Sequence, residues 1–264
     1  MTEIHLYKSG EVDIKVQFPQ SWNECRREDL LHIADFILLH KINLTALFKL
    51  LMQEALKAHN INGMRNAHIL ELISVEDMAM NYGPLTEFIT NGIALTAQPV
   101  TIKGMASPED GFANITCGEY EDAEALFMEI LEQLKQYQED TKGEFINDHL
   151  HVLCKWFAVL YRPKTEDGNA EPYIPAKAQV YNPGTQNLLL AMLWYMGCNA
   201  QLPKMFPMVF LHDGKAEPDP MAITKLIHHG AGPKNGTREQ IRQMPLLEFL
   251  YDLQMEAEKE AIGK

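Results

Sequence analysis

The sequence predicts a mainly α-helical α+β protein, in which an N-terminal β-hairpin and one short additional strand pack on a helical core. Apolar and polar residues alternate in the first eighteen positions, which is the period of a half-buried strand. Further along, apolar residues recur every three or four positions, which is the period of an amphipathic helix. Several Ser/Thr-x-x-Glu/Gln patterns, the capping boxes that begin helices, precede such stretches.

The predicted hairpin has Lys8–Glu11 as its turn and ends at Pro19, which cannot donate to a strand ladder. Its inward-facing positions are Ile4, Leu6, Val12, Ile14, Val16 and Phe18. A capping box at Ser21–Glu24 predicts a helix that carries Leu30, Ile33, Ala34, Ile37 and Leu38. Asn43 is expected to cap a second helix, which Asn62-Gly63 ends.

The next segment is predicted to hold the additional strand. Gly83-Pro84 is expected to begin a weak helix through Ile89, because proline suits the first helical position. Pro99–Lys103 then reads as a short strand, which we expect to pair with the hairpin, and Ser107–Gly111 reads as a turn.

Thr116–Glu119 is the clearest capping box in the chain and predicts a helix of about five turns. Its apolar stripe consists of Tyr120, Ala123, Phe127, Ile130, Leu131, Leu134 and Tyr137. Glu121 and Glu124 fall outside this stripe, and the pair Glu121-Asp122 is interpreted as part of a solvated helix face. We therefore assign no acid/base pair.

The second half of the chain is predicted to be helical apart from one long connection. A helix from Phe145 is expected to end before Pro163, and an apolar helix, 186–196, is expected to end at Gly197 as its C′ residue. Short helices follow at 221–229 and after Thr237, and Pro245 begins the last one. The Pro/Gly-containing loop 164–184 is the expected boundary between a domain at 1–163 and a helical part at 185–264, with a single domain as the alternative.

Composition excludes several classes of function. The 264 residues carry 23 basic and 36 acidic side chains, a net charge of −13, which disfavours nucleic-acid binding because phosphate neutralisation needs clustered Lys and Arg. The four cysteines are widely spaced, which favours a reducing compartment over a disulfide scaffold. No targeting segment is evident, and no apolar stretch approaches the roughly 20 residues that cross a bilayer. We expect a cytoplasmic protein without membrane partners.

No motif identifies a catalytic residue, a metal site or a cofactor, and we predict none of the three. Asp148, His151 and Cys154 have the (i, i+3) spacing of metal ligands on a helix, but we interpret them as partly buried polar residues of the helix. His228–Thr237 resembles a phosphate loop only superficially, because the Gly-Lys-Ser/Thr order is missing. Cys117 begins a strong helix, where the macrodipole lowers a thiol pKa, yet neighbouring carboxylates oppose that effect.

The predicted partner-binding residues surround the long loop: Tyr161, Arg162, Tyr173, Ile174 and Tyr181. Arg162 has a structural alternative, since an arginine at a helix end bonds the last carbonyls or pairs with a helix carboxylate. The expected mode of binding places a helical or disordered segment of a larger protein against exposed apolar positions.

Five ordered motifs carry a resemblance to a known group of proteins: Pro19–Glu24, Asn114–Tyr120, Ala158–Pro163, Leu193–Cys198 and the stretch with Gly236, Thr237 and Pro245. The series resembles uncharacterised proteins from phages and prophages of Bacteroidetes-type bacteria, encoded near tail and head–tail genes, and covers Ile4 to Leu253. The resemblance implies a tail-assembly factor or chaperone and carries over no catalytic or binding residue.

We therefore expect a non-enzymatic phage morphogenesis protein, a tail-assembly chaperone or minor virion component, in the host cytoplasm or in the virion. Its expected partners are other phage structural or tail proteins, and a homo-oligomer remains open. One alternative is a small-molecule or nucleotide-dependent enzyme. The other is a phage regulator or host-defence interacting protein, which the acidic charge permits.

Overall fold

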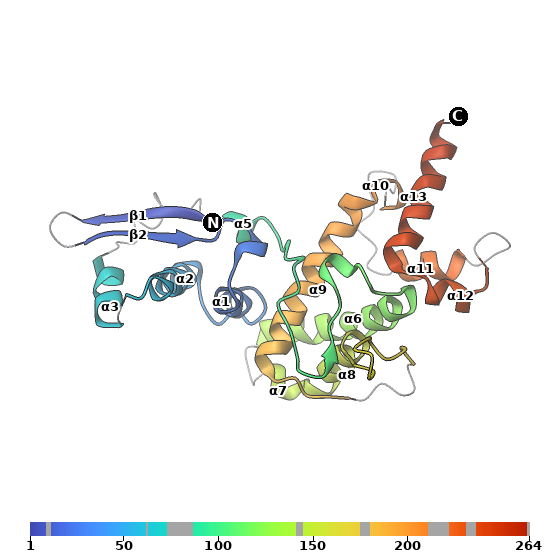
Figure 1. The fold of residues 1–264 in the computed structure, drawn as a ribbon, viewed down its shortest axis with the longest axis horizontal. Helices are drawn as coiled ribbons and strands as arrows, with labels where there is room; N and C mark the ends of the chain where they lie inside the picture. The colour runs from blue at the N-terminus through green and yellow to red at the C-terminus, as the bar shows by residue number, and fades with distance from the viewer. Residues whose placement is uncertain are drawn as a thin grey trace. The chain divides into compact units, whose positions relative to one another are not determined.

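The structure is a computed structural model that describes residues 1–8, 12–61, 63–72, 87–140, 145–174, 180–210, 222–230 and 236–262. It confirms the predicted mainly helical α+β class, with helices accompanied by two small antiparallel sheets (Figure 1). The chain divides into two compact units, Met1–Leu95 and Thr96–Lys264. The predicted linker 164–184 lies within the second unit, and its residues 175–179 lie outside the described residues.

The first unit begins with the predicted hairpin. Strand β1 (Thr2–Lys8) pairs antiparallel with β2 (Val12–Phe18), and β2 ends directly before Pro19. Residues 9–11 of the predicted turn lie outside the described residues. On the inner face Ile4, Leu6, Val16 and Phe18 are buried, and Phe18 stacks on Phe48 with ring centroids 5.9 Å apart. The hairpin, marginal as two isolated strands, is thus stabilised by packing on a helix.

In the first unit, one predicted helix cap is wrong and another is confirmed. Ser21 precedes a short 3-10 turn, η1 (Trp22–Glu24), but its side chain makes no capping hydrogen bond. The Glu24 carboxylate accepts from the backbone N–H of Gln20 at 2.9 Å. Asn43 does cap its helix, because its side-chain oxygen accepts from Ala46 N at 2.8 Å. The helices are α1 (Arg27–Ile37), α2 (Leu44–Ala58), α3 (Gly63–Leu72) and α5 (Glu87–Thr90). The predicted helix start at Gly83-Pro84 lies outside the described residues.

The predicted strand at Pro99–Lys103 is wrong. The additional strand is β3 (Met105–Ala106), and it pairs antiparallel with β4 (Arg162–Pro163) and not with the hairpin. Val100 donates its backbone N–H to the Gln98 side chain at 2.9 Å and accepts from Ser107 at 3.1 Å. Side-chain bonds therefore take the place of a strand ladder at this position.

Helices build the rest of the second unit (Figure 1). They are α6 (Cys117–Asp140), α7 (Phe145–Asp148), α8 (Leu150–Leu160), α9 (Thr185–Met205), α10 (Pro207–Phe210), α11 (Ala222–His229), α12 (Arg238–Gln243) and α13 (Leu246–Ile262). The helix predicted from Phe145 is interrupted at His149, where φ is −115°. Gly197 does not end α9, which continues for two more turns and thereby buries Cys198 and Leu202.

The core of the second unit is centred on α9, which is apolar nearly all round as predicted. Trp194 and Tyr195 are fully buried, and the ring of Phe112 contacts both at 5.1 and 5.3 Å between centroids. The Trp194 indole N–H donates to Thr96 O at 3.0 Å. Tyr120, in the first turn of α6, packs edge-on against Phe112 at 5.8 Å. The core therefore holds the start of α6 in a fixed position.

Candidate functional site

The site is built on the first turn of α6, which a confirmed capping box begins. Thr116 donates its backbone N–H to Glu119 Oε2 at 2.8 Å, and Glu119 N donates to Thr116 Oγ1 at 3.3 Å. Backbone bonds from Cys117 N to Met244 O at 2.9 Å and from Leu246 N to Ile115 O at 2.8 Å bind the same turn to the α12–α13 connection. The start of α6 is thus anchored to a segment more than a hundred residues away.

Three carboxylates in the first two turns of α6 are buried or partly buried: Glu119, Glu121 and Asp122. Glu119 is fully buried and Glu121 is 6% exposed, so the interpretation of Glu121 as part of a solvated face is wrong. Burying an ionised carboxylate is unfavourable unless a cation and hydrogen bonds compensate it. The physical reason for the error is that these partners come from distant parts of the chain.

Each carboxylate has a basic partner. Arg162 Nη2 lies 2.6 Å from Glu119 Oε1. Arg242 donates to Glu121 and, at 2.8 Å, to Asp122. We call Glu119, Glu121, Asp122 and these two arginines the carboxylate–arginine cluster.

Further side chains join Glu121 and Asp122 from the periphery. Arg238 and His228 lie 2.8 and 2.9 Å from Glu121 Oε1, and both are 44% exposed. The Tyr173 hydroxyl donates to Asp122 Oδ2 at 2.7 Å. The cluster thus joins α6 to β4, α11, α12 and the segment that contains Tyr173.

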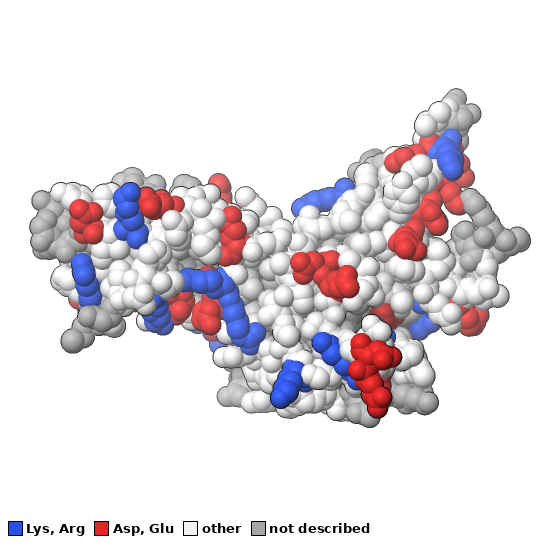
Figure 2. All heavy atoms as spheres, in the orientation of Figure 1, with Lys and Arg blue, Asp and Glu red and all other residues white. Residues whose placement is uncertain are grey.

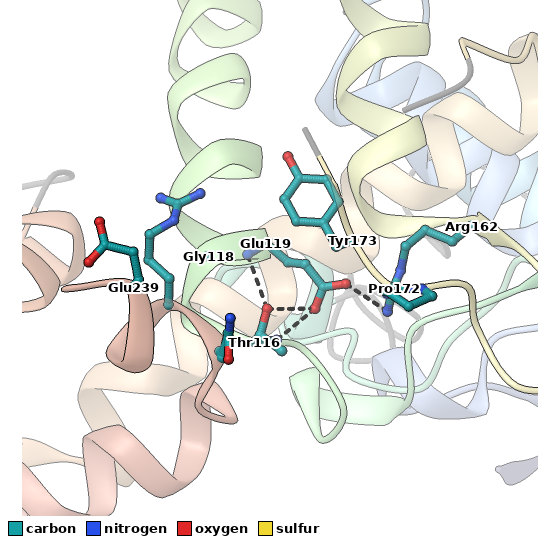
Figure 3. A pocket seen from close by; sticks show the side chains of 9 residues that line it. Thr116, Gly118, Glu119, Arg162, Pro172, Tyr173 and Glu239 are labelled. Carbon is teal, nitrogen blue, oxygen red and sulfur yellow. Dashed lines mark hydrogen bonds and ion pairs between the residues drawn. The ribbon is translucent and has the colours of Figure 1, made fainter. Parts of the chain in front are cut away.

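A pocket of about 440 Å³ opens beside the carboxylate–arginine cluster (Figure 3). Its lining residues are Thr116, Gly118, Glu119, Arg162, Pro172, Tyr173, Glu239, Arg242 and Gln243. Gly118 allows α12 to approach α6, because a Cβ there would lie 2.9 Å from Arg242 O. The volume lies in the range of about 300–1,000 Å³ that is typical of ligand sites.

Burial shifts the pKa values of the groups around the pocket. It raises the pKa of Asp122 and lowers that of Arg242, in each case because it disfavours the charged form. It also raises the pKa of Tyr173, whose bond to Asp122 acts in the same direction. A phenol with a raised pKa stays protonated at neutral pH, so Tyr173 acts as a hydrogen-bond donor.

The predicted partner-binding residues divide between the interior, the cluster and the surface. Tyr161 is fully buried, stacks on Phe157 at 3.9 Å and donates to Gln98 Oε1 at 2.9 Å, so it offers no surface to a partner in this structure. Arg162 and Tyr173 meet at the carboxylates. Ile174 and Tyr181 are each 44% exposed.

Sequence reasoning missed Glu121, Asp122, Arg238 and Arg242 as members of one site. The one local signal was the capping box, which places Glu119 in the first turn of α6, where negative charge is favourable. A second missed group is Glu124, which is 5% exposed and accepts from Tyr195 Oη at 2.8 Å and Asn199 Nδ2 at 3.2 Å. Burial raises the pKa of this carboxyl group.

The other residues singled out in the sequence lie as follows. Burial raises the pKa of the Cys117 thiol to about 12, against the direction of the helix dipole. The ring of His149 packs on Phe145 at 5.1 Å, and Cys154 is buried. Within the described ranges no three His, Cys, Asp or Glu side chains are grouped to hold a metal ion. Residues 231–235 of the loop after His229 lie outside the described residues.

Comparison with protein-family models, with curated proteins and with solved structures found no match to this chain. Over the residues that the structure describes, no helix has both the length and the apolar character that a membrane span requires. On the face drawn in Figure 2, acidic and basic side chains are interspersed over most elements, and acidic side chains gather along α13.

Proposed function

We propose that this chain is a non-enzymatic bacteriophage morphogenesis protein, a tail-assembly factor or chaperone that acts by binding another phage structural protein. The resemblance of its ordered motifs to phage proteins encoded near tail genes supports this proposal. A factor of this kind works in the cytoplasm of the bacterial host. A minor virion component would differ in that the protein stays in the finished particle.

The structural observation that carries the proposal is a set of three exposed apolar side chains in the segment 164–184. Ile174, Val180 and Tyr181 are 44%, 52% and 44% exposed. Ile174 directly follows Tyr173, whose bond to Asp122 attaches this segment to α6. Apolar side chains presented on an anchored segment are typical of surfaces that bind proteins.

The experiment is co-expression of the tagged chain with the neighbouring tail proteins, followed by mass spectrometry of captured lysate proteins and of purified particles. A tail protein captured from lysate, with the chain absent from particles, supports an assembly factor, and its presence in particles supports a virion component. Tyr181→Ser should weaken capture. Tyr251→Ser, at a tyrosine on α13 that is 57% exposed, is the matched control. Failure to capture any tail protein contradicts the proposal.

A small-molecule or nucleotide-dependent enzyme is the second candidate, and the 440 Å³ pocket is the observation that favours it. The arginines that line this pocket are already paired with Glu119, Glu121 and Asp122, which leaves them less available to a phosphate. A thermal-shift screen with nucleotides and divalent metals tests this candidate, because a ligand that binds the folded chain raises Tm.

A further inference from the structure

The two arginines that line the pocket beside α6 already use their terminal nitrogens within the protein. Arg162 donates from Nη1 to Glu171 O at 2.6 Å, and its Nη2 lies 2.6 Å from Glu119. Both terminal nitrogens of Arg242 donate to carboxylates of α6. An arginine that is paired in the plane of its guanidinium group still offers the flat face of that group and its methylene stem.

In each ion pair the arginine is more exposed than the carboxylate. The side chain of Arg162 is 18% exposed against 1% for Glu119, and that of Arg242 is 23% exposed against 8% for Glu121. A group that enters the pocket therefore meets the arginine of each pair more than its carboxylate.

The charges of the lining disfavour an ionic ligand. An anion would find the terminal nitrogens of both arginines occupied, and Glu239, an exposed carboxylate of the lining, would repel it. A cation would be repelled by Arg162 and Arg242. A neutral aromatic ring meets neither obstacle, and the negative face of its π system is attracted to a guanidinium face.

The wall of the pocket suits the same kind of group. Pro172 and Tyr173 line it together with Arg162 (Figure 3). A proline ring and a tyrosine ring provide the flat apolar surfaces against which an aromatic side chain packs. Ile174, which belongs to the proposed partner surface, follows Tyr173 directly in the chain. The pocket and that surface are thus parts of one continuous segment.

We propose that this pocket binds an aromatic side chain of the partner protein, which packs on Pro172 and Tyr173 and directs its π face to the paired guanidinium groups of the lining. The inference rests on the proposed function and specifies its recognition chemistry. The pocket prefers a neutral aromatic group to a saturated group of the same size, and it prefers both to ions.

The test is an NMR titration of the ¹⁵N-labelled full chain that follows the backbone amide of Gly118, a residue of the pocket lining. The neutral probes are N-acetyl-phenylalanine methylamide and its cyclohexylalanine analogue, which has nearly the same size but no π system. The ionic probes are inorganic phosphate and methylguanidinium. We expect the phenylalanine probe to shift the signal saturably and the cyclohexylalanine probe to need at least about threefold higher concentration for half-saturation. The ions should need at least about tenfold higher concentration.

Two arginines of α12 provide a matched pair of variants. Arg238 and Arg242 both bond to Glu121, but of the two only Arg242 belongs to the pocket lining. Lysine keeps the positive charge but has no flat face. Arg242→Lys should therefore lower the preference for the aromatic probe to less than about twofold, whereas Arg238→Lys should leave it unchanged. Thermal unfolding shows whether each variant folds, and Arg162→Lys tests the same expectation if Arg242→Lys does not.

Four results would overturn the inference. They are the absence of a saturable shift with the phenylalanine probe, equal half-saturation by the two neutral probes, half-saturation by an ion at an equal or lower concentration, and an equal loss of preference in Arg238→Lys and Arg242→Lys. The titration needs no phage protein, so its failure removes the role of the pocket and leaves the capture experiment to judge the proposed function separately.

Discussion

Two glutamates of α6 are almost equally buried but face opposite kinds of partner. Glu121 is 6% exposed and lies against basic side chains, whereas Glu124 is 5% exposed and lies against neutral donors. The substitutions Glu121→Gln and Glu124→Gln make the same chemical change less than one helical turn apart. We expect the first to destabilise the fold and the second to leave it nearly unchanged.

The magnitude for Glu121→Gln follows from the exposure of its partners. Removing one member of a buried ion pair costs about 3–5 kcal/mol, because a charge remains buried without compensation. Here Arg238 and His228 are each 44% exposed and regain water, and surface pairs contribute only about 0–1 kcal/mol. Arg242, 23% exposed, keeps Asp122 at 2.8 Å. We therefore expect a loss of about 2–3 kcal/mol in the free energy of unfolding.

Glu124→Gln should change the free energy of unfolding by less than about 1 kcal/mol. The glutamine oxygen still accepts from Tyr195, and no cation loses its partner.

The assay is urea denaturation at pH 7, with peptide-resolved hydrogen exchange to assign the transition to the second unit. Hydrogen exchange is needed because the chain has two compact units, and the change belongs to only one of them. A loss for Glu124→Gln as large as that for Glu121→Gln would refute the reasoning, since burial alone would then set the cost.

Three further predictions concern the same unit. Gly118→Ala should lower stability by about 1–3 kcal/mol, because its Cβ would lie 2.9 Å from Arg242 O. Gly63→Ala should change stability by less than about 1 kcal/mol, because beyond its own helix and chain neighbours no described atom lies within 4 Å of the new Cβ; equal shifts of Tm would contradict this. Tyr161→Phe keeps the stacked ring but loses the 2.9 Å hydrogen bond of the hydroxyl, so chemical denaturation should show a loss of about 1 kcal/mol, and an unchanged midpoint would contradict it. The pKa of Glu124 is raised in the fold, so the folded chain holds this proton more tightly than the unfolded chain does. The contribution of Glu124 to stability should therefore fall as pH rises from the usual pKa of 4.5 through the raised value. Glu124→Gln should lack this fall, and parallel pH profiles of the two proteins would contradict the prediction.

The elements that the sequence predicts correctly are those whose cause is local. The Thr116–Glu119 box and the Asn43 cap each satisfy backbone groups within four residues, so their pattern is complete in one short stretch. The hairpin follows from alternation over adjacent residues. These features need no knowledge of the tertiary fold.

The errors arise where tertiary contacts override a local pattern. Val100 is fully buried and β-branched, as in a strand, yet a side chain two residues away takes its N–H. Glycine is the residue type that most often follows a helix end, but ending α9 at Gly197 would leave Cys198 and Leu202 out of the core. A side-chain hydrogen bond decides the backbone conformation in the first case, and the burial of residues beyond the glycine decides it in the second.

The carboxylate–arginine cluster could not be predicted for a more general reason. Glu121 lies outside the apolar stripe of α6, and its basic partners Arg238 and Arg242 follow 117 and 121 residues later. The acidic side chains exceed the basic ones by 13 (36 against 23), and Asp and Glu are mostly exposed in proteins, so a solvated position is the better expectation for any one carboxylate. What separates Glu121 from the others is the approach of α12 to the start of α6, which Gly118 permits and the backbone bond from Cys117 to Met244 maintains. Gly118, the second residue of α6, thus permits the close approach of α12 that brings Arg242 to Glu121, three positions further along α6.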